Sequence, residues 1–180
     1  MIQPQRLSAQ LVEEIQAQRE LLEAEKGDLQ VHLEQVAPAA LLASLRDVYA
    51  GHPAAAGCMI RIECPPGVRG VMSDPLLLRR VLGNLLKNAL EASAPGQVIT
   101  LSYSEADAPA FRAHNQSVMP AEVSAQVFQR SFSTKGGHGR GLGTYSVRLL
   151  TERYLRGSVA FTSAAGEGTT FVVRLPPVSP

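Results

Sequence analysis

The hydrophobic pattern of residues 73–93 predicts one long helix that is apolar along most of its length. Asp74 is a good N-cap, and Pro75 suits the first helical position, where its missing N–H is no loss. At 3.6 residues per turn, one face collects the apolar residues Leu78, Val81, Leu82, Leu85 and Ala89.

A polar strip formed by Asn84, Asn88 and Glu91 runs along the edge of this apolar face. Asn is a poor residue for a helix interior, because its side chain competes with the helix for backbone hydrogen bonds. Two explanations remain open at this point. The amides satisfy buried backbone groups or face water, or they belong to a binding site.

A second helical pattern covers residues 7–25, where Leu7, Leu11, Ile15 and Leu22 recur on an otherwise polar surface, and this helix is expected to end at Gly27. The apolar stripe is narrow, which is typical of a two-helix seam. We therefore expect the helix to pack against a partner that this chain does not supply. A solitary helix docked on its own domain is the alternative.

Shorter patterns and turn residues predict the remaining elements. The expected strands are 29–33, 59–64, 68–72, the alternating segment around Ile99, Leu101 and Tyr103, 111–115, and the hairpin 158–163 with 169–175. The expected helices are 38–49, 120–129 and 144–154. The end of the chain, residues 177–180, is expected to be disordered.

Composition is typical of one ordinary soluble domain, with 180 residues, 45% hydrophobic and 18% charged. The chain has no apolar run that could span a bilayer and no signal peptide, so we expect a cytoplasmic location, with any membrane segments upstream in a longer parent protein. A net charge of +1 is not the excess of positive charge that is typical of nucleic-acid-binding proteins.

Cys58 and Cys64 lack metal-ligand spacing and are expected to be buried structural thiols.

The segment 131–144, SFSTKGGHGRGLGT, is rich in glycine and runs into a predicted helix. Backbone N–H groups of such a segment can bind phosphate oxygens. The motif is weak by itself, since it is neither a P-loop nor a dinucleotide fingerprint, and a mobile surface loop is the alternative. The order along the chain, with an Asn-bearing helix first and a Gly-x-Gly-Thr turn last, favours a nucleotide site.

Four motifs in this order resemble those of the ATP-binding catalytic domain of sensor histidine kinases, in the superfamily that includes gyrase, Hsp90 and MutL. They are NLLKNA at 84–89, FQRSFSTK at 128–135, GRGLG at 139–143 and GEGTTF at 166–171. The resemblance runs from about residue 36 to residue 176. It implies an α+β fold, a two-layer α/β sandwich (Bergerat ATP-binding fold) with a mixed, mainly antiparallel sheet and helices on one face, preceded by an N-terminal helix.

The resemblance also implies roles for individual residues. Asn88 would bind Mg²⁺, while Asn84 and Glu91 would be the catalytic residues, Asn84 at the general-base or phosphate-contact position and Glu91 ordering the metal's waters. Thr169 would lie on the adenine side. The full set of implied cofactor-binding residues is Asn84, Lys87, Asn88, His114, Asn115, Lys135, Gly139, Arg140, Gly141, Leu142, Gly143 and Thr169.

One departure from the family concerns the base. The family's box is Asp-x-Gly-x-Gly, and its Asp accepts a hydrogen bond from the adenine amino group, whereas residues 114–120 are HNQSVMP. Aligned on Met119 and Pro120, the Asp position falls on His114. A neutral imidazole or the Asn115 carbonyl can accept one bond, but losing the carboxylate weakens adenine binding by about ten- to a hundredfold. A strand-end His that faces solvent is the alternative.

The activity implied by the resemblance is transfer of the ATP γ-phosphoryl to a His on a dimerisation hairpin. None of His32, His52, His114 and His138 lies in such a helical setting. Residues 1–28 resemble the end of that hairpin, and residues 29–176 the catalytic domain. The implied partners are the phosphoacceptor helix of the same or a partner protomer, a second copy in the full-length homodimer and a response regulator, with no nucleic acid.

Two other hypotheses belong to different classes. The first is a degenerate domain, with weak or no ATP binding, that serves as a docking or regulatory module. The second is an anti-sigma or mitochondrial-type protein kinase of the same superfamily. The helix predicted at 7–25 disfavours the second, because it resembles a dimerisation helix. The Asn84 and Asn88 pair disfavours the first, because a purely structural domain has no need for it.

Overall fold

The computed structural model describes residues 15, 18–19, 21–130 and 143–177. Its main feature is a five-stranded sheet whose strands follow the order β2-β4-β5-β7-β6. The strands are β2 (Met59–Glu63), β4 (Val98–Ser104), β5 (Ala110–Asn115), β6 (Ser158–Ala164) and β7 (Gly168–Arg174). The pair of β2 and β4 is parallel, and the other neighbouring strands are antiparallel. The expected mixed, mainly antiparallel sheet is confirmed.

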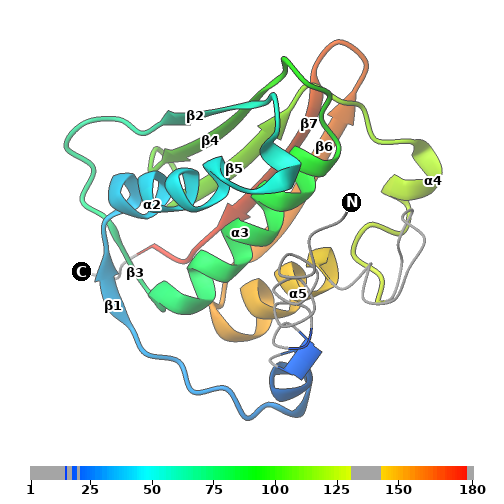
Figure 1. The fold of residues 1–180 in the computed structure, drawn as a ribbon. Helices are drawn as coiled ribbons and strands as arrows, with labels where there is room; N and C mark the ends of the chain where they lie inside the picture. Colours follow the sequence, from blue (N-terminus) through cyan, green and yellow to red (C-terminus); the bar gives the residue numbers. More distant parts are fainter. Residues whose placement is uncertain (1–14, 16–17, 20, 131–142, 178–180) are drawn as a thin grey trace.

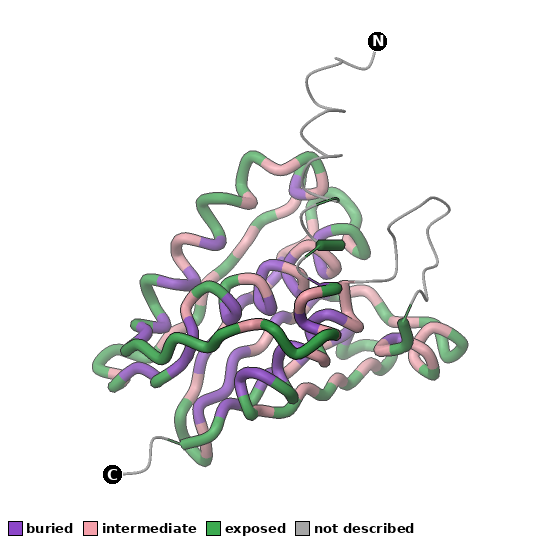
Figure 2. Tube along the Cα trace, turned by 90° about the horizontal axis from the view of Figure 1, so that it is seen from below, coloured by how far each residue is buried: buried purple, intermediate pink, exposed green. Residues whose placement is uncertain are grey.

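Three helices cover one face of this sheet (Figure 1). They are α2 (Pro38–Ala50), α3 (Pro75–Glu91) and α5 (Gly143–Leu149). Alternate strand residues such as Leu101, Phe111 and Val173 are fully buried against these helices, and buried residues gather where the two layers meet (Figure 2). The fold is therefore the two-layer α+β sandwich that the sequence motifs imply.

Helix α3 lies at the centre of the helical layer, and its start and inner face are as predicted. The Asp74 carboxylate caps it by accepting hydrogen bonds from the N–H groups of Leu76 and Leu77, both at 2.9 Å. All five residues of the predicted apolar face are buried. Gly83 is also buried, on a side of the helix where an added Cβ would lie 3.2 Å from the Tyr49 hydroxyl of α2. Flanking helices therefore bury α3 well beyond one face.

The predictions for the first half of the chain were wrong in two places. Residues 29–33 form no strand, and β1 is the later segment Glu34–Val36. It pairs with β3 (Val71–Ser73), which is shifted from the predicted 68–72, in a separate two-stranded sheet. The physical reason is that strand pairing begins only at Glu34, which lies opposite Ser73. The preceding segment is held instead by a hydrogen bond from the His32 N–H to the Asp74 carboxylate at 2.9 Å.

Two predicted helices differ in detail. The helix expected at 120–129 is only the single turn α4 (Ala121–Ser124), followed by turns. The helix expected at 144–154 starts at Gly143 and ends in a π-helical turn, η2 (Leu150–Tyr154). A 3₁₀ turn, η1 (Pro53–Ala55), follows α2.

The carboxyl end of the N-terminal helix, residues 21–26, is attached to the domain. Tyr154 donates a hydrogen bond to the Ala24 carbonyl at 2.6 Å, and Arg153 donates to the Glu25 carbonyl at 3.0 Å. Gly27, with φ of +91°, ends the helix as predicted. These donors satisfy carbonyl groups that a helix end leaves without partners.

The face of this helix that contacts the domain is not the predicted stripe. Leu21 and Ala24 are buried, whereas Ile15 and Leu22 are 64% and 50% exposed. Leu7 and Leu11 lie outside the described residues. Docking on the same domain therefore occurs through a different face, and the prediction of a helical partner for the stripe stays a prediction.

The two cysteines are free thiols, and both are half-buried rather than buried. They lie at or beyond the ends of the edge strand β2, where cover is incomplete, and Cys58 donates a weak hydrogen bond to the Ala94 carbonyl at 3.4 Å.

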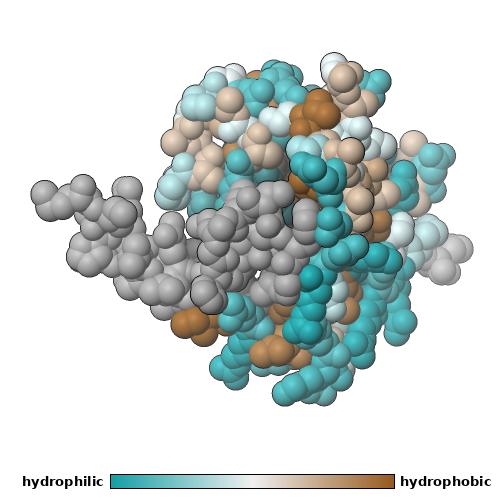
Figure 3. All heavy atoms as spheres, turned by 90° about the vertical axis from the view of Figure 1, so that its right-hand side faces the viewer, coloured by the Kyte–Doolittle hydropathy of each residue, from teal (hydrophilic) through white to brown (hydrophobic). Residues whose placement is uncertain are grey.

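On the side shown in Figure 3, the described surface is mostly hydrophilic, with hydrophobic residues in small groups. No described helix combines the length and apolar character needed to cross a bilayer.

Replacing Asp74 with Ala should lower the free energy of unfolding by about 2 kcal/mol, because the α3 cap and the bond to the His32 N–H are lost together. The measurement is urea denaturation. Asp47→Ala is the matched control, since this carboxylate is exposed and pairs only with the neighbouring Arg46, and it should change stability by less than about 0.5 kcal/mol. Equal effects of the two substitutions would contradict the capping role.

Candidate functional site

The polar strip of α3 lies partly open beside the buried core. Asn84, Lys87 and Asn88 are half-buried, and Glu91 is exposed. The Asn88 amide nitrogen is itself buried and has no hydrogen-bond partner among the described residues. A buried amide without a partner costs about 1–3 kcal/mol, so Asn88 is placed for an interaction that the described chain does not provide.

Gly143 lies directly beside Asn88. A Cβ added to this glycine would lie 3.7 Å from the amide nitrogen and 3.8 Å from the amide oxygen of Asn88. Gly143 is the first residue of α5 and the last residue of the glycine motif GRGLG. The fold thus brings the end of the glycine segment to the middle of the α3 polar strip.

A second buried amide belongs to Asn115, the last residue of β5. The side chain is 4% exposed, and its nitrogen also lacks a partner among the described residues. Phe111 and Ala113 of the same strand belong to the core, and side chains alternate along a strand, so Asn115 points to the helical side of the sheet. Its register partner on β7 is Thr169.

A chain of hydroxyl groups fixes the segment that follows Asn115. The Met119 N–H donates to Ser163, the Thr169 hydroxyl donates to the Ser117 carbonyl, and the two hydroxyl oxygens of Ser163 and Thr169 lie 2.8 Å apart. Since Thr169 uses its proton on Ser117, Ser163 donates to Thr169. The Ser117 hydroxyl donates to the carbonyl of Ala92 at the end of α3, at 2.6 Å. The end of β5 is thereby held between α3 and the hairpin.

These positioning residues were missed in the sequence. Ser117 and Ser163 carry no motif, and their roles depend on which strands pair. Gly168 belongs to the predicted turn and to the motif at 166–171, but its structural role was not predicted: its φ is +74°, and a Cβ there would overlap the Asn115 carbonyl oxygen and lie 2.8 Å from the Cα of Gln116. Only glycine permits this close approach of β7 to the end of β5.

The strand geometry favours Asn115 over His114 for the base-recognising position, and the role of each residue stays a prediction. His114 has the opposite orientation to Asn115 and lies on the sheet face away from the helices, where its Nδ1 is 3.0 Å from the Thr170 hydroxyl. Moving the motif alignment by one residue would exchange the two faces. The structure brings Asn115, and not His114, to the side where Asn88 lies.

An aromatic row continues inward from Asn115 and Thr169. Phe171, next along the same face of β7, contacts Phe161 of β6 with ring centroids 5.5 Å apart, and Phe128 packs on both rings edge to face. The Thr144 hydroxyl of α5 donates to the Val127 carbonyl and fixes the segment that carries Phe128. The buried amide of Asn115 therefore borders an apolar aromatic surface.

Five predicted site residues, Lys135, Gly139, Arg140, Gly141 and Leu142, lie outside the described residues. For metal binding, the described part of the chain contains no group of three or more His, Cys, Asp or Glu side chains. Mg²⁺ is commonly bound through one or two protein ligands together with substrate phosphates and water.

Glu25 of the N-terminal helix connects to both described sides of the glycine segment. Its carboxylate pairs with Arg130 at 3.2 Å and accepts a hydrogen bond from Tyr145 of α5. Burial, and then this bond, raises the pKa of Tyr145, so the phenol keeps its proton at neutral pH and continues to donate. The N-terminal helix is thus linked to the residues that flank the glycine-rich segment.

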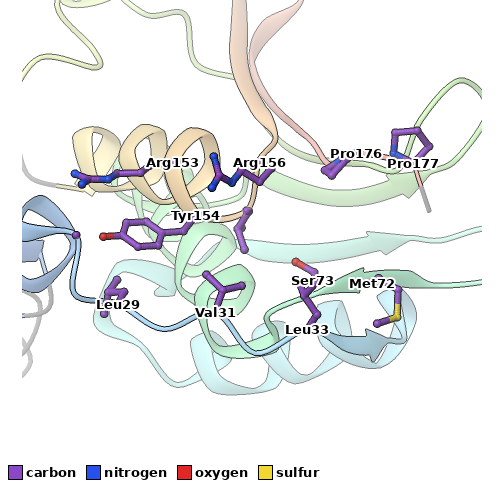
Figure 4. Close-up of a pocket in the computed structure, with 12 residues that line it drawn as sticks. Leu29, Val31, Leu33, Met72, Ser73, Arg153, Tyr154, Arg156, Pro176 and Pro177 are labelled. Atoms are coloured by element: carbon purple, nitrogen blue, oxygen red, sulfur yellow. The ribbon is translucent and has the colours of Figure 1, made fainter. Parts of the chain in front are cut away.

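A groove of about 700 Å³ lies elsewhere, between residues 29–33 and the end of η2 (Figure 4). Leu29, Val31 and Leu33 form one side, and Arg153, Tyr154 and Arg156 the other. Those predicted site residues that the structure describes take no part in its lining. The groove is therefore separate from the polar strip of α3.

Replacing Gly168 with Ala should lower the free energy of unfolding by at least about 3 kcal/mol, because both the positive φ and the overlap with the Asn115 carbonyl must be relieved. The matched control is Gly166→Ala. That residue has φ of +81° with no atom within 4 Å of the added Cβ, so it should cost only about 1–2 kcal/mol. Thermal unfolding distinguishes the two, and equal losses would refute the close-approach role.

Comparisons with known proteins agree with this geometry. Residues 73–179 match the model of the histidine kinase-, DNA gyrase B- and HSP90-like ATPase family. The chain is 28% identical over 171 residues to the sensor protein DivL of Caulobacter vibrioides, which covers 94% of this chain and 22% of DivL. It is 34% identical over 113 residues to the sensor histidine kinase CusS of Escherichia coli O157:H7, covering 59% of this chain and 23% of CusS.

The fold is also shared with solved structures. Full-length ShkA, crystallised in complex with AMPPNP, superposes with a TM-score of 0.73 at 20% identity, covering 98% of this chain and 39% of ShkA. The chain spans only about a fifth of the length of DivL and CusS. On the match across residues 73–179, this chain belongs to the histidine kinase-, DNA gyrase B- and HSP90-like ATPase family.

Proposed function

We propose that this chain is the ATP-binding catalytic part of a longer sensor histidine kinase, with residues 29–176 as the catalytic domain. The observation that carries the proposal is the buried Asn88 amide, which lacks a partner among the described residues and lies against Gly143 at the end of the glycine motif. Family membership and the similarity to CusS support a kinase over the other activities of this fold.

Asn88 is the proposed Mg²⁺ ligand, through its amide oxygen. Half-buried Asn84 and exposed Glu91 continue the same strip toward the two ends of α3 and are assigned to a phosphate or general-base role and to the metal's waters. When bound, Mg²⁺ supplies positive charge that bridges and neutralises phosphate oxygens. Lys87, half-buried next to Asn88, is assigned to phosphate contact.

The base is assigned to the space bordered by Asn115, Thr169 and the aromatic row. An apolar wall with a few polar groups is the usual chemistry of a small-ligand site. Lys135, Gly139, Arg140, Gly141 and Leu142 keep their proposed roles in covering and contacting the phosphates. His114 is withdrawn from the site.

The proposed reaction transfers the γ-phosphoryl group of ATP to an imidazole nitrogen. The protein contributes positioning and charge neutralisation rather than covalent chemistry. The acceptor His lies on a dimerisation helix of the same or a partner protomer, for which residues 1–28 supply the end of the second helix. A homodimer, a downstream response regulator and a cytoplasmic location complete the proposal. Two buried amides without partners in the described chain argue against a purely structural docking module.

Replacing Asn88 with Ala should abolish Mg²⁺-dependent ATP binding measured by isothermal titration calorimetry, because the proposed metal ligand is removed. Leu76→Ala is the control on the same helix, since Leu76 is 75% exposed at its opposite end, and its affinity should equal that of the wild type. Urea denaturation checks that both variants fold. Unchanged binding by Asn88→Ala would refute the metal assignment.

Phosphotransfer should be detectable when the domain is mixed with ATP, Mg²⁺ and a separately produced dimerisation hairpin that carries a His followed by Glu or Asp. The expected product is acid-labile phosphohistidine on the hairpin, absent with Asn88→Ala. Weak or no ATP binding, together with no phosphohistidine on cognate hairpins, would instead favour the regulatory-module hypothesis.

A further inference from the structure

The amide of Asn115 has hydrogen-bonding capacity that the described chain leaves unused. Its nitrogen is buried without a partner, in a side chain that is only 4% exposed. Thr169 is the residue paired with Asn115 on β7. Its hydroxyl donates a hydrogen bond to the Ser117 carbonyl and accepts one from the Ser163 hydroxyl. The described residues therefore leave this donor available for a ligand or a trapped water molecule.

The surroundings of Asn115 suit the edge of a planar heteroaromatic ring. Phe171 and Phe161 form the next row of side chains on the same face of the sheet, and their centroids are 5.5 Å apart. Such a surface favours a flat apolar face, while the amide supplies one donor and one acceptor at its rim. Gly168 and the hydroxyl chain hold the backbone of this strand end in place.

We propose that Asn115 recognises the purine edge and that, because it is a carboxamide, it accepts both amino-purine and keto-purine triphosphates. This inference rests on the proposed nucleotide-binding function. With adenine, the amide oxygen accepts from the amino group and the amide nitrogen donates to the ring nitrogen beside it. With a keto-purine, the amide turns by half a rotation, so that its nitrogen donates to the keto oxygen and its oxygen accepts from the ring N–H.

A carboxylate at this position would behave differently. An ionised Asp offers only acceptors, which suit the adenine amino group and leave a keto oxygen facing like charge. The other side chains near Asn115 do not discriminate between adenine and a keto-purine either. Thr169 has no free proton, and His114 is on the opposite face, with Thr170 as its partner.

The test compares ATP with inosine triphosphate, which differs from ATP only in carrying a keto group and a ring N–H in place of the amino group and ring nitrogen. Dissociation constants are measured with Mg²⁺ by isothermal titration calorimetry. In the wild-type chain we expect the two constants to agree within about tenfold. Asn115→Asp should raise the preference for ATP at least tenfold, mainly by weakening the inosine nucleotide.

His114→Ala is the matched control from the neighbouring position, and it should leave both constants unchanged. The wild-type ratio tests the inference even if Asn115→Asp fails to fold. A wild-type preference for ATP above a hundredfold, or a ratio that Asn115→Asp does not move, would overturn the inference and leave the proposed function intact. Binding of neither nucleotide to the wild type would overturn both.

Discussion

Leaving a buried amide nitrogen without a hydrogen-bond partner is unfavourable, and among the described residues the fold does so at Asn88 and again at Asn115. The rest of the architecture holds both amides in place. Helix α3 is packed on most sides, which fixes the half-buried Asn88 at the edge of the core. Asn115 ends a central strand that is paired on both sides. The domain thus keeps an energetic cost that a ligand can offset.

The supports of the two amides come from distant parts of the chain. The Asp74 cap fixes the start of α3, and the Ser117 hydroxyl binds the carbonyl of Ala92 at its end. The β6–β7 hairpin reaches the same place through Ser163, Thr169 and the close approach of Gly168. Because these contacts join the end of β5 to both α3 and the β6–β7 hairpin, the position of Asn115 depends on elements that are remote in sequence.

Much of this arrangement could be predicted from local sequence. The polar strip and inner face of α3 follow from helical periodicity and a good N-cap, and the sheet strands from alternation. Local sequence could not decide between His114 and Asn115, since moving an alignment by one residue places the other side chain on a given face of the strand. Residues 29–33 have a strand-like composition, but no neighbouring strand pairs with them.

The docked face of the N-terminal helix could not be predicted for a related reason, because it depends on Arg153 and Tyr154, which are remote in sequence and bind the last carbonyl groups of the helix. The central claim, that the two buried amides face a bound nucleotide, is tested most directly by NMR of the side-chain amide groups in isotope-labelled protein. Adding ATP with Mg²⁺ should shift the signals of Asn88 and Asn115 and leave the His114 imidazole unmoved. Shifts confined to the groove around Leu29 and Arg156, with both amides unchanged, would contradict it.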